Sequence, residues 1–382
     1  MKILFVLNNL YAVGNGLSAS ARRTVAALKE AGEEVKVLSG PNAASDGPQP
    51  DFRLKDFRFP IFEPIIRAHG YKFASTDVKV VEEAVRWADV IHMQEPFVLE
   101  IRTAKIARRL GKPITGTYHM HPENIFHSLG LGSSYLPNHW LLTAWRDLCF
   151  NKWDLVQCPT ANVLDRLQQN GFTSRLRLIS NGIVPDQCIR QPQEVKAPFT
   201  ICCIGRLAGE KDQMTLLRAM EYSTHAKDIR LIFAGKGPRE KRFRRQADSL
   251  YKKGILSHKP EFVFLDRDGL RELAASSLLC IHCATVEVEG LSIIEALQQG
   301  AVPVIAYGPI TGADQFALDE RSRFAQGNAQ ELAQKIDFWL DHPEQMDAMR
   351  GRYIEEMQRY VIRNSAEQLI QMFQEAMHNS LP

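Results

Sequence analysis

Short apolar runs alternate with longer segments of helical periodicity along the chain, and this alternation constrains the fold more than any other feature. Because apolar strands joined through helices form parallel sheets, the pattern predicts an α/β protein. Strands are expected in two series, at 2–7, 34–38, 90–93, 114–118, 155–158 and 176–179, and then at 199–204, 229–234, 261–265, 278–283 and 303–306. The polar segment between the two series, 186–198, contains two prolines and is typical of an interdomain linker.

The length of 382 residues is sufficient for two domains of ordinary size. No apolar stretch reaches the roughly 18 residues that a transmembrane helix needs. The apolar start of the chain is too short for a signal peptide, and we expect it to form the first strand. The seven cysteines show no scaffold spacing, so we expect reduced thiols in a cytoplasmic protein. Cys280 and Cys283 have C-x-x-C spacing, but their apolar surroundings favour a buried strand over a metal or redox site.

Charge is distributed unevenly between the two halves. Residues 1–185 hold 22 Lys and Arg against 17 Asp and Glu, whereas the remainder holds 25 against 27. A modestly basic first half suggests an anionic partner surface, such as a membrane, more than a nucleic acid. No nucleic-acid-binding motif is present, so we expect no nucleic-acid partner.

One stretch of the second half combines two carboxylates with a predicted helix start. Glu287 precedes Gly290, and Glu295 lies about one turn inside a helix that begins near Leu291. The first N–H groups of such a helix, near Gly290, Leu291 and Ser292, have no intrahelical acceptor and suit a phosphate. Glu295 would then lie near a neutral polar group such as a ribose diol, which fits a nucleotide. An ordinary solvated helix start is the alternative, and this stretch alone leaves both interpretations open.

The same residues carry a family resemblance. Glu287 and Glu295, with seven residues between them, are followed by Ala296, Gly300 and the buried strand 303–306. This order resembles the donor-site signature of retaining GT-B glycosyltransferases of the family 4 type. The remaining motifs of the chain can be compared with that family.

The resemblance implies an α/β protein of the GT-B fold, with two Rossmann-like doubly wound domains facing each other across a cleft. An N-terminal acceptor-binding domain is expected over 1–185, followed by the linker over 186–198. A nucleotide-sugar-binding domain is expected over 199–361. The resemblance further implies that a C-terminal helix over 362–382 crosses back to the N-terminal domain.

Two positions early in the chain resemble family elements. Gly14 and Gly16 lie in the loop after the first strand, before a helix that Ser18 can cap. The glycines allow close approach of a ligand, and in the family this loop faces the donor diphosphate and the acceptor. His119 follows a strand and matches the histidine that contacts the transferred sugar in the family.

Other polar residues of the first half have weaker assignments. Asn181 lies in a turn that resembles the family's Pro-Asn-Gly turn, with Ser180 in place of proline. His121, Glu123 and Asn124 could address an acceptor hydroxyl. A metal on the His-x-His pair is disfavoured, because no further ligands have the expected spacing.

Two elements of the second half resemble the family's diphosphate-binding segments. Arg206 and Lys211 match a G-R-x(3–4)-E-K element, and Gly235 and Gly237 match a turn beside the nucleotide. Transfer leaves a nucleoside diphosphate, whose developing charge must be met by cations. With both cations present, the sequence predicts that neither a metal nor another cofactor is required.

The resemblance therefore assigns a role to each candidate residue. His119 and Glu287 would hold the sugar, Arg206 and Lys211 the diphosphate, and Glu295 the ribose. The glycine-rich turns and the helix start would line the nucleotide, through Gly14, Gly16, Asn181, Gly235, Gly237, Gly290, Leu291 and Ser292.

Two segments bear on a lipid partner. The segment 51–74 alternates aromatic with basic residues, which suits a membrane interface, whereas aromatic side chains packed into the domain core are the alternative. Bulky apolar residues recur with helical spacing over 126–153, which is more typical of core than of an acceptor cleft.

A predicted helix over 97–110 places Arg102, Lys105 and Arg109 on one face. A solvated face is the ordinary interpretation, and contact with anionic lipid is favoured here because of the neighbouring aromatic segment. Glu289 stands where many family members have Phe, which resembles the subgroup that glycosylates lipids.

The sequence thus predicts a retaining hexosyltransferase that moves a hexose from a nucleotide sugar, expected to be UDP-linked, to a membrane lipid such as diacylglycerol or ceramide. We expect it to lie peripherally on the inner face of the cell membrane, against anionic lipid. A soluble or polyprenyl-linked acceptor in polysaccharide assembly is the alternative within the enzyme class. A nucleotide-sugar-binding protein without activity is the alternative outside it.

Overall fold

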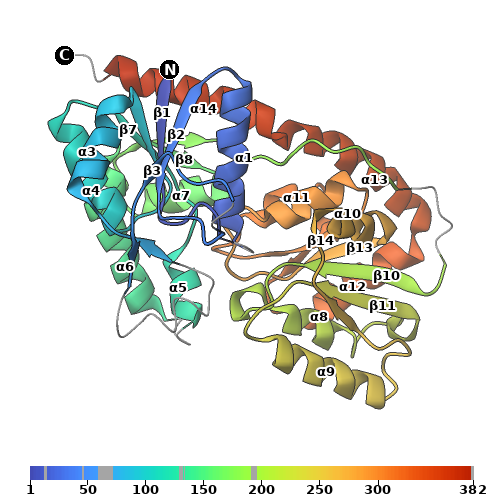
Figure 1. The fold of residues 1–382 in the computed structure, drawn as a ribbon. Coiled ribbons are helices and arrows are strands. Elements are labelled where there is room, and N and C mark those ends of the chain that lie inside the picture. Colours follow the sequence, from blue (N-terminus) through green and yellow to red (C-terminus); the bar gives the residue numbers. More distant parts are fainter. Residues whose placement is uncertain are drawn as a thin grey trace. The chain divides into compact units, whose positions relative to one another are not determined.

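The computed structural model describes residues 1–12, 15–44, 47–58, 72–128, 132, 134–190 and 196–379. The chain divides into two compact units, each built on a parallel sheet (Figure 1). The first unit comprises Met1–Pro122, Tyr135–Val184 and the segment from Ile362 onward, and the second comprises Glu123–Ser134 and Pro185–Val361.

The sheet of the first unit has seven parallel strands in the order β3-β2-β1-β6-β7-β8-β9. Its strands are β1 (Lys2–Val6), β2 (Glu34–Ser39), β3 (Phe52–Arg53), β6 (Val90–Met93), β7 (Ile114–Thr117), β8 (Leu155–Cys158) and β9 (Arg175–Leu178). The inner strand β1 pairs Ile3 with Val35 of β2 on one side and with Val90 of β6 on the other. A separate antiparallel pair joins β4 (Asp56–Phe57) to β5 (Phe73–Ala74).

Helices cover both faces of this sheet. They are α1 (Gly16–Glu30), α3 (Val78–Trp87), α4 (Val98–Arg109), α6 (Tyr135–Leu148), α7 (Ala161–Gln169) and α14 (Ile362–Asn379). The expectation that Ser18 caps α1 is wrong. The helix begins three residues earlier than that cap implies, so Asn15 occupies the N-cap and its Oδ1 accepts the Ser18 N–H at 3.2 Å. The Ser18 hydroxyl instead donates to Asn9 O at 2.6 Å.

The last helix, α14, belongs to the core of the first unit. Leu369, Met372 and Phe373 are buried together with residues of β1 and α1, and α1 and α14 lie side by side (Figure 1). The start of α14 is fixed by the backbone N–H of Ile362, which donates to Ile183 O at 2.7 Å. A side chain on Gly182 would place its Cβ 2.7 Å from the Ile362 Cα, so this close approach requires glycine.

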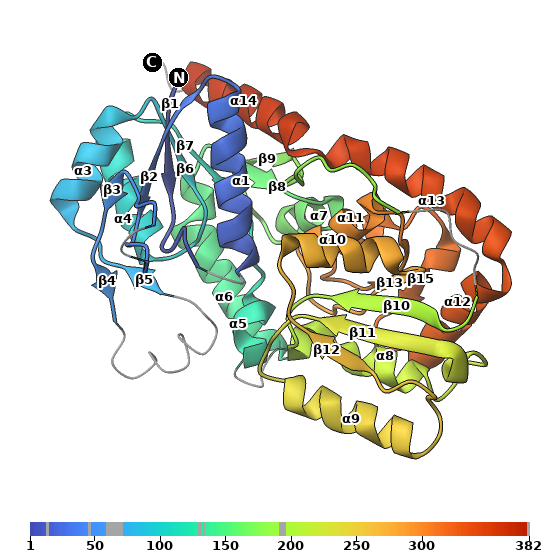
Figure 2. The ribbon, with the colours of Figure 1, turned by 45° about the vertical axis from the view of Figure 1, so that its right-hand side comes forward.

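The sheet of the second unit has six parallel strands in the order β12-β11-β10-β13-β14-β15. Its strands are β10 (Phe199–Ile204), β11 (Ile229–Ala234), β12 (Glu261–Val263), β13 (Leu279–His282), β14 (Val302–Tyr307) and β15 (Arg323–Ala325). Its principal helices are α8 (Gln213–Ala219), α9 (Glu240–Lys252), α10 (Arg267–Ser276), α11 (Leu291–Gln298), α12 (Ala329–Asp341) and α13 (Pro343–Met357). Figure 2 shows α10 and α11 on one face and α8 and α9 on the other, which is a doubly wound arrangement.

The α/β prediction is confirmed in both series. Every expected strand is found within two residues of its expected bounds. The C-x-x-C run forms a buried strand, because Cys280 lies in β13 and Cys283 directly after it, and both are free thiols. No helix of the described residues is both long and apolar enough to cross a bilayer.

The segment 51–74 divides between packed and exposed aromatic residues. Phe52 packs against Trp87, with rings 6.2 Å apart, and Phe73 packs edge-on against Phe97 at 5.1 Å. Phe57 is 48% exposed. Residues 59–71, which include Phe59, Phe62, Arg67 and Tyr71 of the predicted membrane loop, lie outside the described residues.

Replacing Phe373 tests whether α14 is part of the first unit's core. Phe373→Ala removes a fully buried ring that packs on His92 at 5.1 Å, so it should destabilise the unit by about 3–5 kcal/mol. Thermal and urea unfolding, followed by far-ultraviolet circular dichroism, would measure this. Gln374→Ala, at an exposed position of the same helix, should leave the midpoints unchanged. Equal midpoints for both variants would contradict the packing of α14.

Candidate functional site

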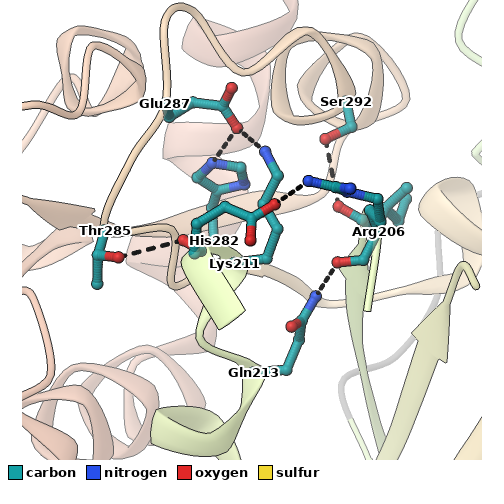
Figure 3. Close-up of polar contacts among 9 residues, drawn as sticks. Arg206, Lys211, Gln213, His282, Thr285, Glu287 and Ser292 are labelled. Atoms are coloured by element: carbon teal, nitrogen blue, oxygen red, sulfur yellow. Dashed lines mark hydrogen bonds and ion pairs between the residues drawn. The ribbon is translucent and has the colours of Figure 1, made fainter. Parts of the chain in front are cut away.

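A buried charge cluster lies at the carboxyl end of β13. Glu287, in the loop between β13 and α11, accepts a hydrogen bond from Lys211 Nζ through Oε2. Nε2 of His282, the last residue of β13, lies 3.2 Å from the same oxygen (Figure 3). Burial alone would raise the pKa of Glu287, but Lys211 and His282 hold that pKa well below the usual range of a carboxyl group. Glu287 is therefore ionised.

The backbone of Glu287 is fixed as firmly as its side chain. Its N–H donates to Ile310 O at 3.0 Å, and its carbonyl accepts from the Gly312 N–H at 2.8 Å. These bonds form an isolated bridge between Glu287 and Thr311. The backbone that carries the carboxylate is thus held by the segment 310–312.

The chain turns sharply directly after Lys211. Asp212 adopts a left-handed conformation, with φ +42° and ψ +42°, which Asp tolerates better than most residues. Its carboxylate accepts from Thr215 Oγ1 at 2.6 Å, and its carbonyl accepts from the Thr215 N–H at 3.0 Å. The turn separates the short 3-10 helix Gly209–Lys211 from α8, which begins at Gln213.

Arg206 forms a second cation–carboxylate pair next to the first. Its Nη2 donates to Oε1 of Glu210, whose side chain is only 4% exposed. The Glu210 carbonyl accepts from the Thr285 N–H at 2.8 Å, so it also braces the loop that carries Glu287. Gln213 Nε2 donates to Arg206 O at 2.9 Å (Figure 3). The two cations and their carboxylates thus form one connected polar cluster.

The loop that carries Arg206 packs against the turn that follows β11. A Cβ on Gly235 would lie 2.0 Å from Gly205 O, and one on Gly237 would lie 2.2 Å from Leu207 O. The Leu207 N–H donates to Lys236 O at 3.0 Å, which joins the two loops. Gly235 and Gly237 therefore have a packing requirement that explains the residue type without any ligand.

The N-terminus of α11 lies next to this cluster in the sequence and in the fold. Gly290 is the N-cap in a left-handed conformation (φ +85°), and no side chain caps the helix. Ser292 Oγ donates to Ile204 O at 3.2 Å, which fixes the helix start against the end of β10. Glu295 lies on the exposed side of α11, one turn from Leu291. The first N–H groups of α11 form a positive helix end beside two cationic side chains.

The other candidate residues belong to the first unit. His119 follows β7, and its Nε2 lies 2.8 Å from Gln94 Oε1; burial lowers its pKa to about 3, so the ring is neutral. Gly16 is the first residue of α1, and Asn181 is buried in the turn that follows β9. Gly14 lies outside the described residues.

His121 is fully buried and its Nδ1 lies 3.1 Å from the Tyr118 hydroxyl and 2.9 Å from Arg166 Nη1. These contacts indicate that its ring supports the local fold. No group of three or more His, Cys, Asp or Glu side chains in the described part of the chain is arranged to hold a metal ion.

Sequence reasoning missed His282 and Glu210. His282 was considered only as part of the run from Cys280 to Cys283, although the carboxyl end of a parallel strand is where ligand sites form. Glu210 was noted only as part of a motif, and its pairing with Arg206 at a spacing of four residues was the available signal.

Comparison with known proteins identifies the class that this fold and cluster define. A model of the Glycosyltransferase Family 4 domain matches residues 14–187, and a model of the Glycosyl transferases group 1 domain matches residues 186–357. The two matches together span most of the chain. The chain belongs to the GT-B glycosyltransferases of this family.

Two curated relatives are similar to this chain over two thirds of its length or more. The chain is 26% identical to the α-monoglucosyldiacylglycerol synthase of Streptococcus pneumoniae (strain ATCC BAA-255 / R6), over 68% of this chain and 58% of that protein. It therefore matches little more than half the length of that relative. The chain is 23% identical to the sulfoquinovosyl transferase SQD2 of Arabidopsis thaliana, over 94% of this chain and 70% of that protein.

A solved structure has the same fold along its whole length. HepE (Alr3699) of Anabaena, in complex with UDP and glucose, superposes with a TM-score of 0.74 at 17% identity. The superposition covers 98% of this chain and 100% of HepE. This likeness confirms the predicted GT-B fold.

Removing the Lys211 charge tests the electrostatics of the cluster. In the wild-type protein the lowered pKa of Glu287 contributes stability above the unfolded pKa of about 4.3, and this stability is lost as the pH falls below it. In Lys211→Met, burial would raise the pKa of Glu287, so the variant should lose stability as the pH rises from 4 to 7.

The gap in unfolding temperature between wild type and Lys211→Met should therefore narrow on acidification from pH 7 to pH 4. Differential scanning calorimetry at several pH values would measure it. Lys241→Met, at an exposed position of α9, is the matched control and should show no gap. A gap that is independent of pH would contradict the ion pair.

Proposed function

We propose that this glycosyltransferase moves a hexose from a UDP-sugar to a membrane lipid such as diacylglycerol or ceramide, with retention of the anomeric configuration. The observation that carries the donor assignment is the cluster of Arg206, Lys211 and Glu287 beside the uncapped N-terminus of α11. The observation that carries the acceptor assignment is an exposed apolar face on α6.

The donor assignment follows from charge. A nucleoside diphosphate leaves during transfer, and its negative charge is stabilised by groups that are in place before the reaction. Arg206, Lys211 and the N–H groups of Leu291 and Ser292 supply positive charge at one place in the second unit. In this proposal those groups bind the diphosphate without a divalent metal, and Glu295 binds the ribose hydroxyls from the exposed side of α11.

Glu287 is assigned to the transferred sugar. It is ionised and accepts hydrogen bonds, so it can accept from sugar hydroxyl groups. His119 of the first unit is a neutral imidazole and is assigned to a hydroxyl group of the same sugar. Because Gly235 and Gly237 have no side chains, the turn after β11 lies close to the loop after β10.

The proposed reaction is a same-face displacement. The bond between the anomeric carbon and the β-phosphate oxygen breaks, and a bond from the acceptor hydroxyl oxygen to that carbon forms on the same face. The leaving phosphate oxygen accepts the proton of the acceptor hydroxyl. The residues of the chain align the donor and stabilise the charge of the leaving UDP, which is where most of the rate acceleration would arise.

The acceptor assignment rests on the surface of the first unit. Tyr135, Leu136 and Trp140 of α6 are 72%, 78% and 68% exposed, a concentration of large apolar side chains that soluble surfaces rarely show. Aromatic rings with a polar edge suit a membrane interface. The name of one curated relative, the α-monoglucosyldiacylglycerol synthase, points to the same class of acceptor.

The basic face of α4 supports a membrane contact less strongly than the sequence suggested. Arg102, Lys105 and Arg109 are all exposed, as the helical spacing predicted. However, Arg109 pairs with Glu82 at 2.7 Å, and Arg102 donates to Thr76 Oγ1. Part of the charge of this face is therefore compensated within the protein, and α6 is the better candidate for lipid contact.

Donor and acceptor can be tested together. Purified protein is incubated with radiolabelled UDP-glucose, UDP-galactose or UDP-N-acetylglucosamine and vesicles that contain diacylglycerol or ceramide. Label should enter the organic phase with one of these sugars, and NMR of the product should show the α anomer for an α-linked donor. Lys211→Ala and Glu295→Ala should each lower UDP release by about 100-fold or more.

Lys241→Ala and Glu344→Ala, at exposed sites of the second unit, are the matched controls and should keep wild-type rates. If the label stays in the aqueous phase while UDP is released, the acceptor is not a lipid of this class. A soluble or polyprenyl-linked acceptor then becomes the better assignment. Binding of UDP-sugar without release of UDP would indicate a binding protein. Wild-type rates in Lys211→Ala and Glu295→Ala would refute the site.

Membrane contact through α6 can be tested separately by sedimentation with anionic vesicles. The double variant Leu136→Glu/Trp140→Glu places two carboxylates on the exposed face and should lower vesicle binding by at least tenfold. Tyr222→Glu, at a residue of the second unit that is 56% exposed, controls for the loss of an exposed aromatic ring. Equal sedimentation of both variants and the wild type would remove the surface argument for a lipid acceptor.

A further inference from the structure

We infer that His282 is a positioning residue that holds Glu287 toward the transferred sugar when Lys211 is drawn to the donor diphosphate. This inference rests on the proposed function, because it assigns Glu287 to the sugar and Lys211 to the diphosphate. It adds a residue, His282, to which the family resemblance of the sequence gave no role.

The geometry of His282 is unusual for a strand residue. Its side chain is 6% exposed, and its Nε2 points toward Glu287 Oε2 at 3.2 Å (Figure 3). This nitrogen is buried, and no described residue gives it a hydrogen bond of good geometry, so the contact with Glu287 is its one polar partner there. A buried polar atom without a partner costs free energy, so a close contact with the carboxylate compensates for its burial.

Lys211 and His282 reach the same oxygen of Glu287 but differ in mobility. Lys211 carries its charge on a flexible chain with three donors, and its side chain is 21% exposed. The ring of His282 is attached to the end of β13, within the sheet, and has only two side-chain torsions. A ligand that attracts the ammonium therefore leaves the imidazole in place.

The donor creates this competition. A diphosphate carries more negative charge than one carboxylate, so the Lys211 ammonium would be shared with it or move toward it. Glu287 would then lose its main cationic partner in a site where burial raises the pKa of its carboxyl group. The backbone bonds to Ile310 and Gly312 hold the residue but not its side-chain torsions. Among the residues that the structure describes, the His282 contact is then the remaining side-chain restraint on the carboxylate.

The contact requires a proton on Nε2, because the carboxylate oxygen only accepts. The neutral ring with its proton on Nε2 and the imidazolium both meet this requirement. Gln also presents an N–H donor on a side chain of comparable reach, whereas Leu and Phe fill the space without a donor. These differences define the test.

The experiment compares His282→Gln with His282→Leu and His282→Phe. Isothermal titration gives the dissociation constants for UDP and for the UDP-sugar that the wild type uses, and initial rates give kcat and KM. His282→Leu and His282→Phe should bind UDP within about twofold of wild type. They should lose the additional affinity that the sugar provides and lower kcat by about ten- to hundredfold, the cost of one hydrogen bond to a charged group.

His282→Gln should restore most of that loss. Cys280→Ala, two residues earlier on the same buried strand, controls for packing and should keep the wild-type preference for UDP-sugar over UDP. Thermal unfolding identifies any variant that does not fold. If His282→Leu does not fold, the comparison of His282→Phe with His282→Gln decides.

Three results would overturn the inference: wild-type behaviour of the Leu and Phe variants, an equal loss of UDP and UDP-sugar affinity, or a Gln variant as impaired as Leu. Each differs from failure of the proposed function. If the proposed function fails, the wild-type protein itself would bind neither UDP nor any UDP-sugar, and the His282 variants would not be informative about the donor.

Discussion

The ion pair between Lys211 and Glu287 is the interaction on which the rest of the candidate site depends. The two side chains are only 21% and 15% exposed, so each charge would be costly to bury alone. Their pairing lets a carboxylate remain ionised at the end of β13, where it is available to a ligand. The pair also joins two segments that are far apart in the sequence, the short helix that ends at Lys211 and the loop before α11.

Around this pair, the parallel sheet explains why these particular segments meet. The carboxyl ends of β10, β11 and β13 lie at one edge, because all three strands run in the same direction. Arg206 follows β10, Gly235 follows β11, and His282 ends β13. The glycine turn after β11 allows the loop after β10 to approach closely. The site is thus a consequence of strand order, since neighbouring strands bring these loops together from positions up to about 80 residues apart.

The sequence predicted most of the fold because buried parallel strands leave a clear trace. Apolar runs bounded by glycine or polar residues marked every long strand. The edge strands β3 and β15 were not predicted, since segments of two or three residues carry little periodic signal, whereas the equally short β12 lies in an apolar run that continues to Leu265. The cap of α1 was assigned to Ser18 instead of Asn15 because both residue types cap helices, and only the backbone conformation distinguishes them.

The candidate site was predicted less completely, for a related reason. Motif spacing identified Arg206, Lys211 and Glu287 as residues of one region, but it contains no information on which side chains pair. The pairing of Lys211 with Glu287, and of Arg206 with Glu210, depends on side-chain torsions and on strand order. His282 was missed because a histidine within an apolar run resembles core, and its contact with Glu287 becomes visible only when the loop that carries Glu287 folds over the end of β13.

The pairing of both cations has a consequence for ligand selection. In the structure Arg206 and Lys211 each donate to a carboxylate, so a ligand must compete with Glu210 and Glu287 for them. A singly charged anion gains little from such an exchange, whereas a diphosphate can contact both cations and the N-terminus of α11 at once. In the proposed function the carboxylates would thereby favour a ligand with two linked phosphates over inorganic phosphate or a nucleoside monophosphate, and they would hold the cations in place before the donor binds. In the proposed function the same exchange would place the released carboxylate of Glu287 beside the sugar, so that binding of the diphosphate and orientation of the hexose would be parts of one event.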